Sequence, residues 1–393
     1  MATADDGTGE GMGEGMGEVM GGEGKVRRVV LLIGHLGLGG AQRQLCLLAE
    51  RLRDRGVEVH VFVLSRGGPH EDDLRAAGIP VHRLGFSRGV TSPAGNLRAF
   101  ARLVRSLRRL RPEVVHGFLY ESYLLGTPAA RLARVPVVVT ARRTQGYLRP
   151  KAPWTAAFEH LVNLMTDHVV ANSVAIAQGT RAVEGVPAGK VSVVYNGLAP
   201  SAFDRAGPEP VGGALPVVAC VARLSGNKGQ RFLVEAAALL ARRGRPCTFV
   251  LVGDGPERGS LERQAEEAGV DVRFLGFRQD NAGLLARADV VALPSLEEGL
   301  SNAVMEAMAA GRPVVATAVG GTPELLEDRG VLVPPAAPEA LADGIARLLD
   351  DPALAASLGA AARAWAWKNL DMEAVTEEHL GLYRRLLAAR RGR

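Results

Sequence analysis

The stretch that decides the fold is KVRRVVLLIGHLGLGGAQRQLCLLAERLRDRGVEVHVFVL, residues 25–64 of a 393-residue chain. It begins with an apolar run, continues through a glycine-rich turn and a segment with apolar residues at helical spacing, and ends in a second apolar run. This order of strand, turn, helix and strand is one βαβ unit. Further apolar runs (VVHGF, PVVVT and DHVVANS) continue the alternation. The first half of the chain is therefore predicted to form a doubly wound parallel α/β sheet.

The second half repeats the pattern after a glycine- and proline-rich segment, AGPEPVGGALP, that is typical of a linker. Its apolar runs are VVACVA, CTFVLV, VRFLGF, DVVALPS, PVVAT and VLVPP. We expect two similar α/β domains, one over residues 25–205 and the other over residues 206–371. Residues 372–393 are helical in pattern, and we expect this helix to pack back on the first domain.

Charge is spread unevenly along the chain. Residues 1–24 hold six acidic residues and no basic ones in a repetitive, glycine-rich context, so we expect a disordered tail. Residues 25–205 hold 26 Lys and Arg against 12 Asp and Glu, whereas residues 206–393 hold 21 against 24. The basic excess of the chain therefore lies in residues 25–205.

The cysteines and the lack of metal-binding patterns argue against a disulfide-stabilised protein and against a metalloprotein. Cys46, Cys220 and Cys247 stand singly in mostly apolar surroundings without a CxxC pair. This predicts buried thiols in a reducing compartment and argues against disulfides or a zinc site. The sequence contains no D-x-D and no His/Cys group at ligand spacing, so we expect neither a metal nor a cofactor. Without an apolar run of about eighteen residues or a basic N-terminal region, we expect a cytoplasmic protein.

The segment PSLEEGLSNAVMEAMAAGRPVVAT, residues 294–317, carries two glutamates eight residues apart, Glu298 and Glu306. An apolar run predicts a strand up to Pro294, a short loop follows, and a helix should end at Gly311. Glu306 lies among apolar residues of that helix, where a carboxylate is costly unless it is paired or bound to a ligand. Free amides at the helix start favour an anion. The pattern therefore predicts a pocket for a ligand with phosphate and hydroxyl groups, and the alternative is two solvated surface glutamates.

Two further loops at predicted strand ends supply candidates. In ARLSGNKGQ, Arg223 and Lys228 are five residues apart across a turn, so both can point into the crevice where open α/β sheets bind ligands. The alternative is ordinary surface charge. The loop GHLGLGGAQ lacks the last glycine of the dinucleotide motif and the GK[ST] of a phosphate-binding loop. It is either a plain turn or a place where a sugar or diphosphate approaches the backbone of Gly39 and Gly40.

Six motifs occur in a fixed order: RLSGNKGQ, VGDGPE, FLGF, ADVVALPS, EEGLSNAVMEAMAAGRPVVAT and VGGTPELL. Together they resemble the nucleotide-binding half of glycosyltransferase family 4, specifically over residues 215–345 and mostly in layout over residues 25–200. The resemblance implies the α/β fold named GT-B, in which two doubly wound Rossmann-like domains face each other across a cleft. It also implies a retaining, metal-independent enzyme that moves a sugar from a nucleotide-diphosphate sugar to an acceptor.

The resemblance further implies roles for individual residues. Arg223 and Lys228 would bind the donor diphosphate. Glu298 would meet the hydroxyls of the donor sugar as a catalytic carboxylate, and Glu306 would hold the ribose hydroxyls. The other implied donor contacts are the amides of Gly299, Leu300 and Ser301, the loop that contains Phe277, and the backbone of Gly39 and Gly40.

The first half departs from the family pattern. Many members place a histidine after the strand that corresponds to PVVVT, in contact with the donor sugar. Here Arg142 stands at that position and is followed by Arg143. The catalytic candidates of this half are therefore Arg142 and the histidine of VVHGF, His116, for which a structural role is the alternative.

The acceptor, a lipid-linked or free saccharide, is expected on the first domain. NLRAFARLVRSLRRLRP, residues 96–112, predicts an amphipathic helix with a basic face. Its apolar stripe would consist of Leu97, Phe100, Leu103, Val104, Leu107 and Leu110. The basic face is either plain solvated surface or a surface that binds an anionic membrane carrying the acceptor. Membrane binding would make this a peripheral protein on the inner face of the membrane.

Other partners and functions were weighed. Nucleic acid is not expected, because the aromatic content of 5% offers few side chains for base stacking. Two alternative functions share the same pockets. One is a protein that binds a nucleotide-sugar without turnover, and the other is a GT-B epimerase or phosphorylase that uses no external acceptor.

Overall fold

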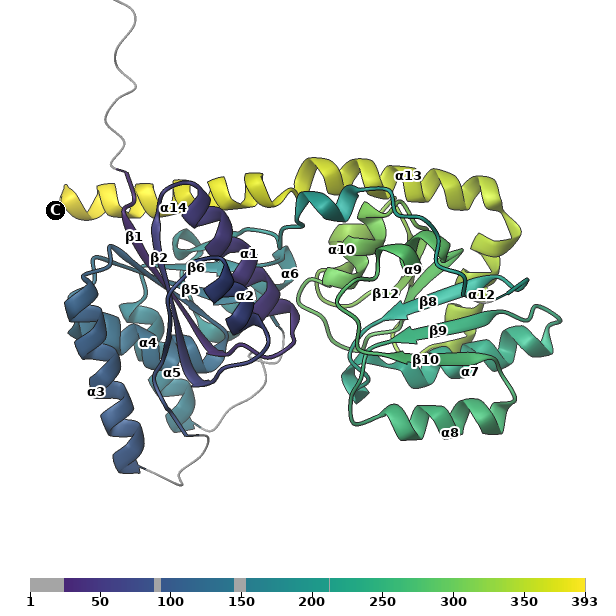
Figure 1. The fold of residues 1–393 in the computed structure, drawn as a ribbon, viewed down its shortest axis with the longest axis horizontal. Coiled ribbons are helices and arrows are strands. Elements are labelled where there is room, and N and C mark those ends of the chain that lie inside the picture. Colours follow the sequence, from purple (N-terminus) through teal and green to yellow (C-terminus); the bar gives the residue numbers. More distant parts are fainter. Residues whose placement is uncertain (1–24, 88–92, 145–152, 212, 393) are drawn as a thin grey trace, which may run out of the picture.

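The structure is a computed structural model that describes residues 25–87, 93–144, 153–211 and 213–392. Two parallel sheets, each covered by helices on both faces, lie side by side, and two long C-terminal helices run along both of them (Figure 1). The predicted fold class, two doubly wound α/β domains, is confirmed.

The first sheet has seven parallel strands in the order β3-β2-β1-β4-β5-β6-β7. The strands are β1 (Arg28–His35), β2 (Glu58–Arg66), β3 (Val81–Arg83), β4 (Val114–Phe118), β5 (Val137–Arg142), β6 (His168–Ala171) and β7 (Val191–Val193). The helices are α1 (Gly40–Asp54), α2 (His70–Ala76), α3 (Pro93–Leu110), α4 (Tyr120–Leu132), α5 (Pro153–Met165) and α6 (Val174–Glu184). The strand order reverses between β1 and β4, which is where such sheets open a ligand crevice.

The second sheet has six parallel strands in the order β10-β9-β8-β11-β12-β13. The strands are β8 (Val217–Val221), β9 (Thr248–Val252), β10 (Val272–Gly276), β11 (Val290–Leu293), β12 (Val314–Thr317) and β13 (Val331–Val333). The helices are α7 (Gln230–Arg242), α8 (Arg258–Ala268), α9 (Ala282–Arg287), α10 (Asn302–Ala309), α11 (Thr322–Leu326) and α12 (Pro338–Asp350). Here the order reverses between β8 and β11, so both candidate loops of the sequence follow the strands at the crevice.

The chain passes between the two domains at two adjacent places. The outward passage runs through Leu198, and the return passage joins α13 (Pro352–Asn369) to α14 (Met372–Arg391). The passages are hydrogen-bonded to each other, because the Leu198 amide donates to the Leu370 carbonyl (2.7 Å) and the Met372 amide donates to the Leu198 carbonyl (3.0 Å). From this point α14 packs on the first domain, against α1 and β5.

Local sequence signals account for the helix that carries Glu306. The Ser301 side chain accepts a hydrogen bond from the Val304 amide and caps the start of α10. Gly311, with φ of +69°, supplies the left-handed residue just after its end. The helix therefore lies where the sequence predicts it.

The basic helix of the first domain is α3, and its apolar stripe is shorter than predicted. Leu103 and Leu107 are fully buried against the sheet. Leu97, predicted to belong to the stripe, is 70% exposed. It lies near the end of α3 that follows residues outside the described part of the chain, and its side chain does not reach the core.

Candidate active site

The two domains touch through the loops at the carboxyl ends of their strands. Asn302, at the start of α10, donates to the Gly40 carbonyl at the start of α1 (3.3 Å) and accepts from the Asn196 side chain (2.8 Å). A Cβ at Gly299 would overlap the carbonyl oxygen of Arg143, at the end of β5. The loop before α10 can therefore meet the first domain only because residue 299 is a glycine.

Lys228 and Glu298 form the centre of the site in the second domain. Lys228 Nζ lies 2.5 Å from Glu298 Oε1, and the Ser295 hydroxyl donates to the same oxygen over 2.7 Å. Glu298 is only 8% exposed. Gly229, with φ of +65°, lets the loop after β8 pack on the Pro294 carbonyl, where a Cβ would overlap. The predicted juxtaposition of the two loops is thus present in the structure.

Further groups that can bind an anion lie on the same two loops. Arg223 is exposed at the end of β8, and no salt bridge joins it to another residue of the described chain. The amides of Gly299, Leu300 and Ser301 lead into α10, whose N-terminus favours negative charge. Leu300 and Ser301 are buried. A cation on the loop after β8 and a neutralised carboxylate and a helix N-terminus after β11 therefore lie at the carboxyl ends of two neighbouring strands.

Glu306 lies one helical turn further into the second domain, and its partner comes from the first. Arg43 Nη1 lies 2.7 Å from Glu306 Oε1, and the Glu306 side chain is 14% exposed. Burial raises the pKa of Glu306 above its ordinary value, and the charge of Arg43 opposes that rise. Arg43 was not among the predicted site residues.

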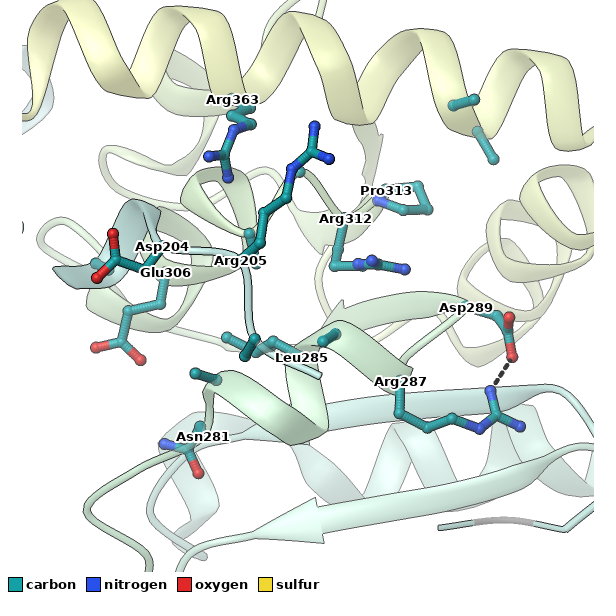
Figure 2. Close-up of a pocket in the computed structure, with 18 of the residues that line it drawn as sticks. Asp204, Arg205, Asn281, Leu285, Arg287, Asp289, Glu306, Arg312, Pro313 and Arg363 are labelled. Carbon is teal, nitrogen blue, oxygen red and sulfur yellow. Dashed lines mark hydrogen bonds and ion pairs between the residues drawn. The ribbon is translucent and has the colours of Figure 1, made fainter. Parts of the chain in front are cut away.

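A cavity of about 990 Å³ begins at this ion pair. It runs between the segment after residue 199, α9, α10 and α13, with Glu306 and Asn281 toward one end and Arg287 and Asp289 toward the other (Figure 2). Several arginines that line the cavity already form ion pairs or hydrogen bonds with other residues of the protein. Arg287 pairs with Asp289 (2.9 Å), and Arg363 donates to backbone carbonyls.

The remaining donor-site candidates lie on separate loops. Gly40 is the first residue of α1 and contacts Asn302 through its carbonyl. The preceding residue, Gly39, is extended, with φ of −179°. Phe277 follows β10 and is 49% exposed, which leaves its ring available to a ligand.

The structure does not bring Arg142 to this site. Its guanidinium is 1% exposed and pairs with Glu184 of α6 at 2.8 Å. It also donates to Thr140 and Asn163 and lies 3.6 Å from the centre of the Tyr123 ring. The side chain of Arg142 therefore belongs to a buried network under the end of β5, whereas the carbonyl of Arg143 borders the site.

His116 is also buried away from the site. Its Nδ1 lies 2.7 Å from the Tyr383 hydroxyl of α14, and the residue is fully buried. Burial lowers the pKa of His116 well below its ordinary value. The neighbouring His379 has its pKa lowered to about 4 for the same reason. Both rings help to seat α14 on the first domain.

No group of three or more His, Cys, Asp or Glu side chains within the described residues has the arrangement of a metal site. None of the helices that the structure describes combines the length and apolar character needed to cross a bilayer.

Family models match both halves of the chain. The one described as "Glycosyltransferase Family 4" matches residues 38–201, and the one described as "Glycosyl transferases group 1" matches residues 215–351. Each matched region contributes one helix to the candidate site. Helix α1 lies in residues 38–201, and α10 lies in residues 215–351.

Similar proteins include enzymes that transfer different sugars. The alpha-D-kanosaminyltransferase of Streptomyces kanamyceticus is 29% identical over 382 residues, which cover 86% of this chain and 98% of that protein. A GDP-mannose-dependent alpha-(1-6)-phosphatidylinositol monomannoside mannosyltransferase of Mycolicibacterium smegmatis is 38% identical over 170 residues, 40% of this chain and 44% of that protein. Among solved structures, Anabaena Alr3699/HepE in complex with UDP-glucose is 26% identical with a TM-score of 0.76, and the match covers 92% of this chain and 99% of that one.

Proposed function

The chain is a glycosyltransferase of the family 4 type with a GT-B fold, and we propose that it moves a sugar from a nucleotide-diphosphate sugar to an acceptor held by the first domain. The observation that carries the proposal is the Lys228–Glu298 pair at the start of α10. The arrangement offers positive charge and free amides for a diphosphate beside a carboxylate for sugar hydroxyls. The related structure with UDP-glucose makes a uridine nucleotide the first donor to test.

The donor would lie across the second domain in a defined order. Arg223, Lys228 and the amides of residues 299–301 face the diphosphate, and Glu298 faces the donor sugar. Glu306 accepts hydrogen bonds from the ribose hydroxyls, and Phe277 lies beside the base. The backbone of Gly39 and Gly40 borders the donor from the first domain. This order assigns one carboxylate to each of the two sugars of the donor.

The transfer step that we propose is that of a retaining enzyme, as the family implies. The acceptor oxygen forms a bond to the anomeric carbon on the face from which the diphosphate leaves, and the bond between that carbon and the diphosphate oxygen breaks. The acceptor proton passes to an oxygen of the leaving diphosphate. Arg223 and Lys228 stabilise the negative charge that grows on the diphosphate, the role that metal ions fill in other transferases.

For Arg142 we propose a positioning role. Its bonds to Glu184 and Asn163 fix the end of β5, and the next carbonyl, that of Arg143, packs against Gly299. His116 similarly holds α14 through Tyr383. In this proposal neither side chain touches the donor.

The acceptor side carries two surface features that favour a lipid-linked acceptor. Arg105 and Arg109 are exposed on α3. On α5, Phe158, Leu161 and Leu164 are 42%, 51% and 60% exposed at helical spacing. A basic helix and an exposed apolar stripe on one domain suit an anionic membrane surface. A saccharide acceptor in solution is the alternative.

The proposal is tested by a donor screen. UDP-glucose, other UDP-sugars and GDP-mannose are each added in a thermal unfolding assay, where a ligand at about 100 times its Kd adds about 2.7 kcal/mol of stability. A stabilising donor is then incubated with lipid and saccharide acceptors and the product is identified by mass spectrometry. The proposal fails if no nucleotide-sugar stabilises the protein. Stabilisation followed by hydrolysis or isomerisation alone would favour the phosphorylase or epimerase alternative.

A further inference from the structure

We propose that Arg43, a residue of the first domain, positions the Glu306 carboxylate for the ribose hydroxyls of a nucleotide bound by the second domain. The inference rests on the proposed function, because ribose at Glu306 is part of it. It adds a donor-positioning residue that lies outside the nucleotide-binding domain.

The contact itself is well defined. Arg43 Nη1 and Glu306 Oε1 are 2.7 Å apart, and they belong to helices that begin at the same interdomain contact, since Asn302 of α10 donates to the Gly40 carbonyl of α1. Within the described chain, no hydrogen bond reaches the other oxygen of Glu306, Oε2. Arg43 therefore holds one carboxylate oxygen and leaves the second able to accept a hydroxyl.

The position of Arg43 in its own helix argues against a purely local role. It lies in the first turn of α1, which contains no acidic residue and has a glycine, Gly39, at its N-cap. A cation at this end is opposed by the helix dipole. The Arg43 side chain is 44% exposed and forms its ion pair across the cleft. What stabilises Arg43 there is Glu306, not its own helix.

Charge explains why Glu306 needs this partner. Burial raises the pKa of Glu306 and so favours its protonated form. In that form one oxygen carries a proton and donates, so the group has fewer places to accept hydrogen bonds from the ribose hydroxyls. Arg43 opposes this rise in pKa and favours the ionised form. Other charged residues lie on the neighbouring elements, namely Asp204 and Arg205 after residue 203, Glu324 on α11, and Arg363 on α13. Arg363 is bonded to the carbonyls of Ala309 and Phe203, and Glu324 to amides of α6. Within the described chain, the salt bridge to Glu306 is formed by Arg43.

The test measures the affinity of UDP and of 2′,3′-dideoxy-UDP by calorimetry between pH 5.5 and pH 8. The proteins compared are the wild type, Arg43→Met, Arg43→Lys and the control Arg53→Met. Arg53 lies at the other end of α1 and bonds to Asp54 and to the Ala77 carbonyl, both in the first domain. GDP and 2′,3′-dideoxy-GDP replace the uridine pair if the wild type binds only guanosine nucleotides.

In Arg43→Met the pKa of Glu306 rises further, so its ionised form is lost at a higher pH than in the wild type. We expect UDP to bind about tenfold more weakly at neutral pH, roughly the loss of one hydrogen bond to a charged group, with a larger loss toward pH 5.5. The dideoxy nucleotide, which lacks the hydroxyls, should bind all four proteins alike. Arg43→Lys should recover most of the affinity and the wild-type pH profile.

The outcomes separate two failures. If Arg43→Met binds UDP as tightly as the wild type or more tightly, or loses affinity for both nucleotides equally, the positioning role is overturned and the proposed function stands. If the wild type binds neither uridine diphosphate nor guanosine diphosphate nor any other nucleoside diphosphate, the proposed function is overturned and the positioning role falls with it.

Discussion

Lys228 Nζ lies 2.5 Å from Glu298 Oε1, and this pair joins the loop after β8 to the loop after β11 at the point where the strand order reverses. A lysine from one strand end thereby neutralises a carboxylate from the next. In the proposed donor complex, the same lysine would also contact the diphosphate.

The two glutamates should separate binding from turnover. Glu306→Gln is expected to weaken nucleotide affinity, because hydrogen bonds to charged groups contribute about 1.5–3 kcal/mol. Glu298→Gln should lower kcat with the full donor and leave the affinity for the bare nucleotide unchanged. Calorimetry with the nucleoside diphosphate and steady-state kinetics with the donor measure the two effects. Equal losses of nucleotide affinity would contradict this division.

Activity should survive removal of metal. EDTA is expected to leave the rate unchanged, because Arg223, Lys228 and the start of α10 face the proposed leaving group. Arg223→Ala should lower kcat by about 10²–10³-fold, as the loss of one charge-stabilising donor does in other enzymes. Rates are measured with and without EDTA and after adding manganese. Inhibition by EDTA that manganese reverses would refute the prediction.

The buried ion pair under β5 should matter for stability. Arg142→Met leaves Glu184 buried without its cation, and the expected loss is about 3–5 kcal/mol of unfolding free energy. Both side chains are only 1% exposed. Arg243→Met is the control, because its pair with Asp343 is exposed at 41% and 67% and should contribute about 0–1 kcal/mol. Urea unfolding measures both, and similar losses would show that burial does not decide the difference.

Gly299 should control the approach of the two domains. Gly299→Ala places a Cβ against the Arg143 carbonyl, and such overpacking costs about 1–3 kcal/mol. We expect a more open arrangement in small-angle scattering and a lower kcat/KM. Gly189→Ala is the control, since a Cβ there meets nothing within 4 Å. A Gly299→Ala variant as compact and active as the control would contradict the prediction, because it would show that the loop shifts to accommodate the added Cβ at little cost.

Membrane binding should depend on the basic face of α3. The protein is expected to sediment with liposomes in proportion to their anionic lipid and to be released by salt, since each basic residue near such a surface adds about 1 kcal/mol. The Arg105→Glu/Arg109→Glu double variant should sediment less, whereas Arg242→Glu in the second domain should not differ from the wild type. Protein that stays in the supernatant at every lipid composition would point to a soluble acceptor.

The sequence predicted the parts of the site that lie on short loops after strands. Lys228 and Glu298 are 70 residues apart, yet parallel strands bring their carboxyl ends to one edge, so the topology alone places them together. Arg43 and Glu306 are 263 residues apart and meet across two domains, and no local pattern marks such a contact.

The directions of side chains on buried strands were harder to predict. His116 and Arg142 lie on β4 and β5, which are buried along their whole length. Strands covered by helices on both faces read as continuous apolar runs, so the alternation that would show where each side chain points is lost. The sequence placed His116 on the correct strand and Arg142 just after its strand, whereas β5 extends to Arg142, and it did not show that either side chain faces the interior.

The return of the chain through Leu370 has a consequence for synthesis. Residues of α14, among them Met372, Leu380 and Tyr383, belong to the same apolar core as β1 and α1. On the ribosome the strands of the first domain emerge before the second domain has been made, but the helix that completes their core emerges only after the second domain. During translation, at about 5–20 residues per second, the core surface of the first domain that α14 covers therefore stays uncovered while the second domain is synthesised. A chain that stops before α14 would leave that surface uncovered permanently.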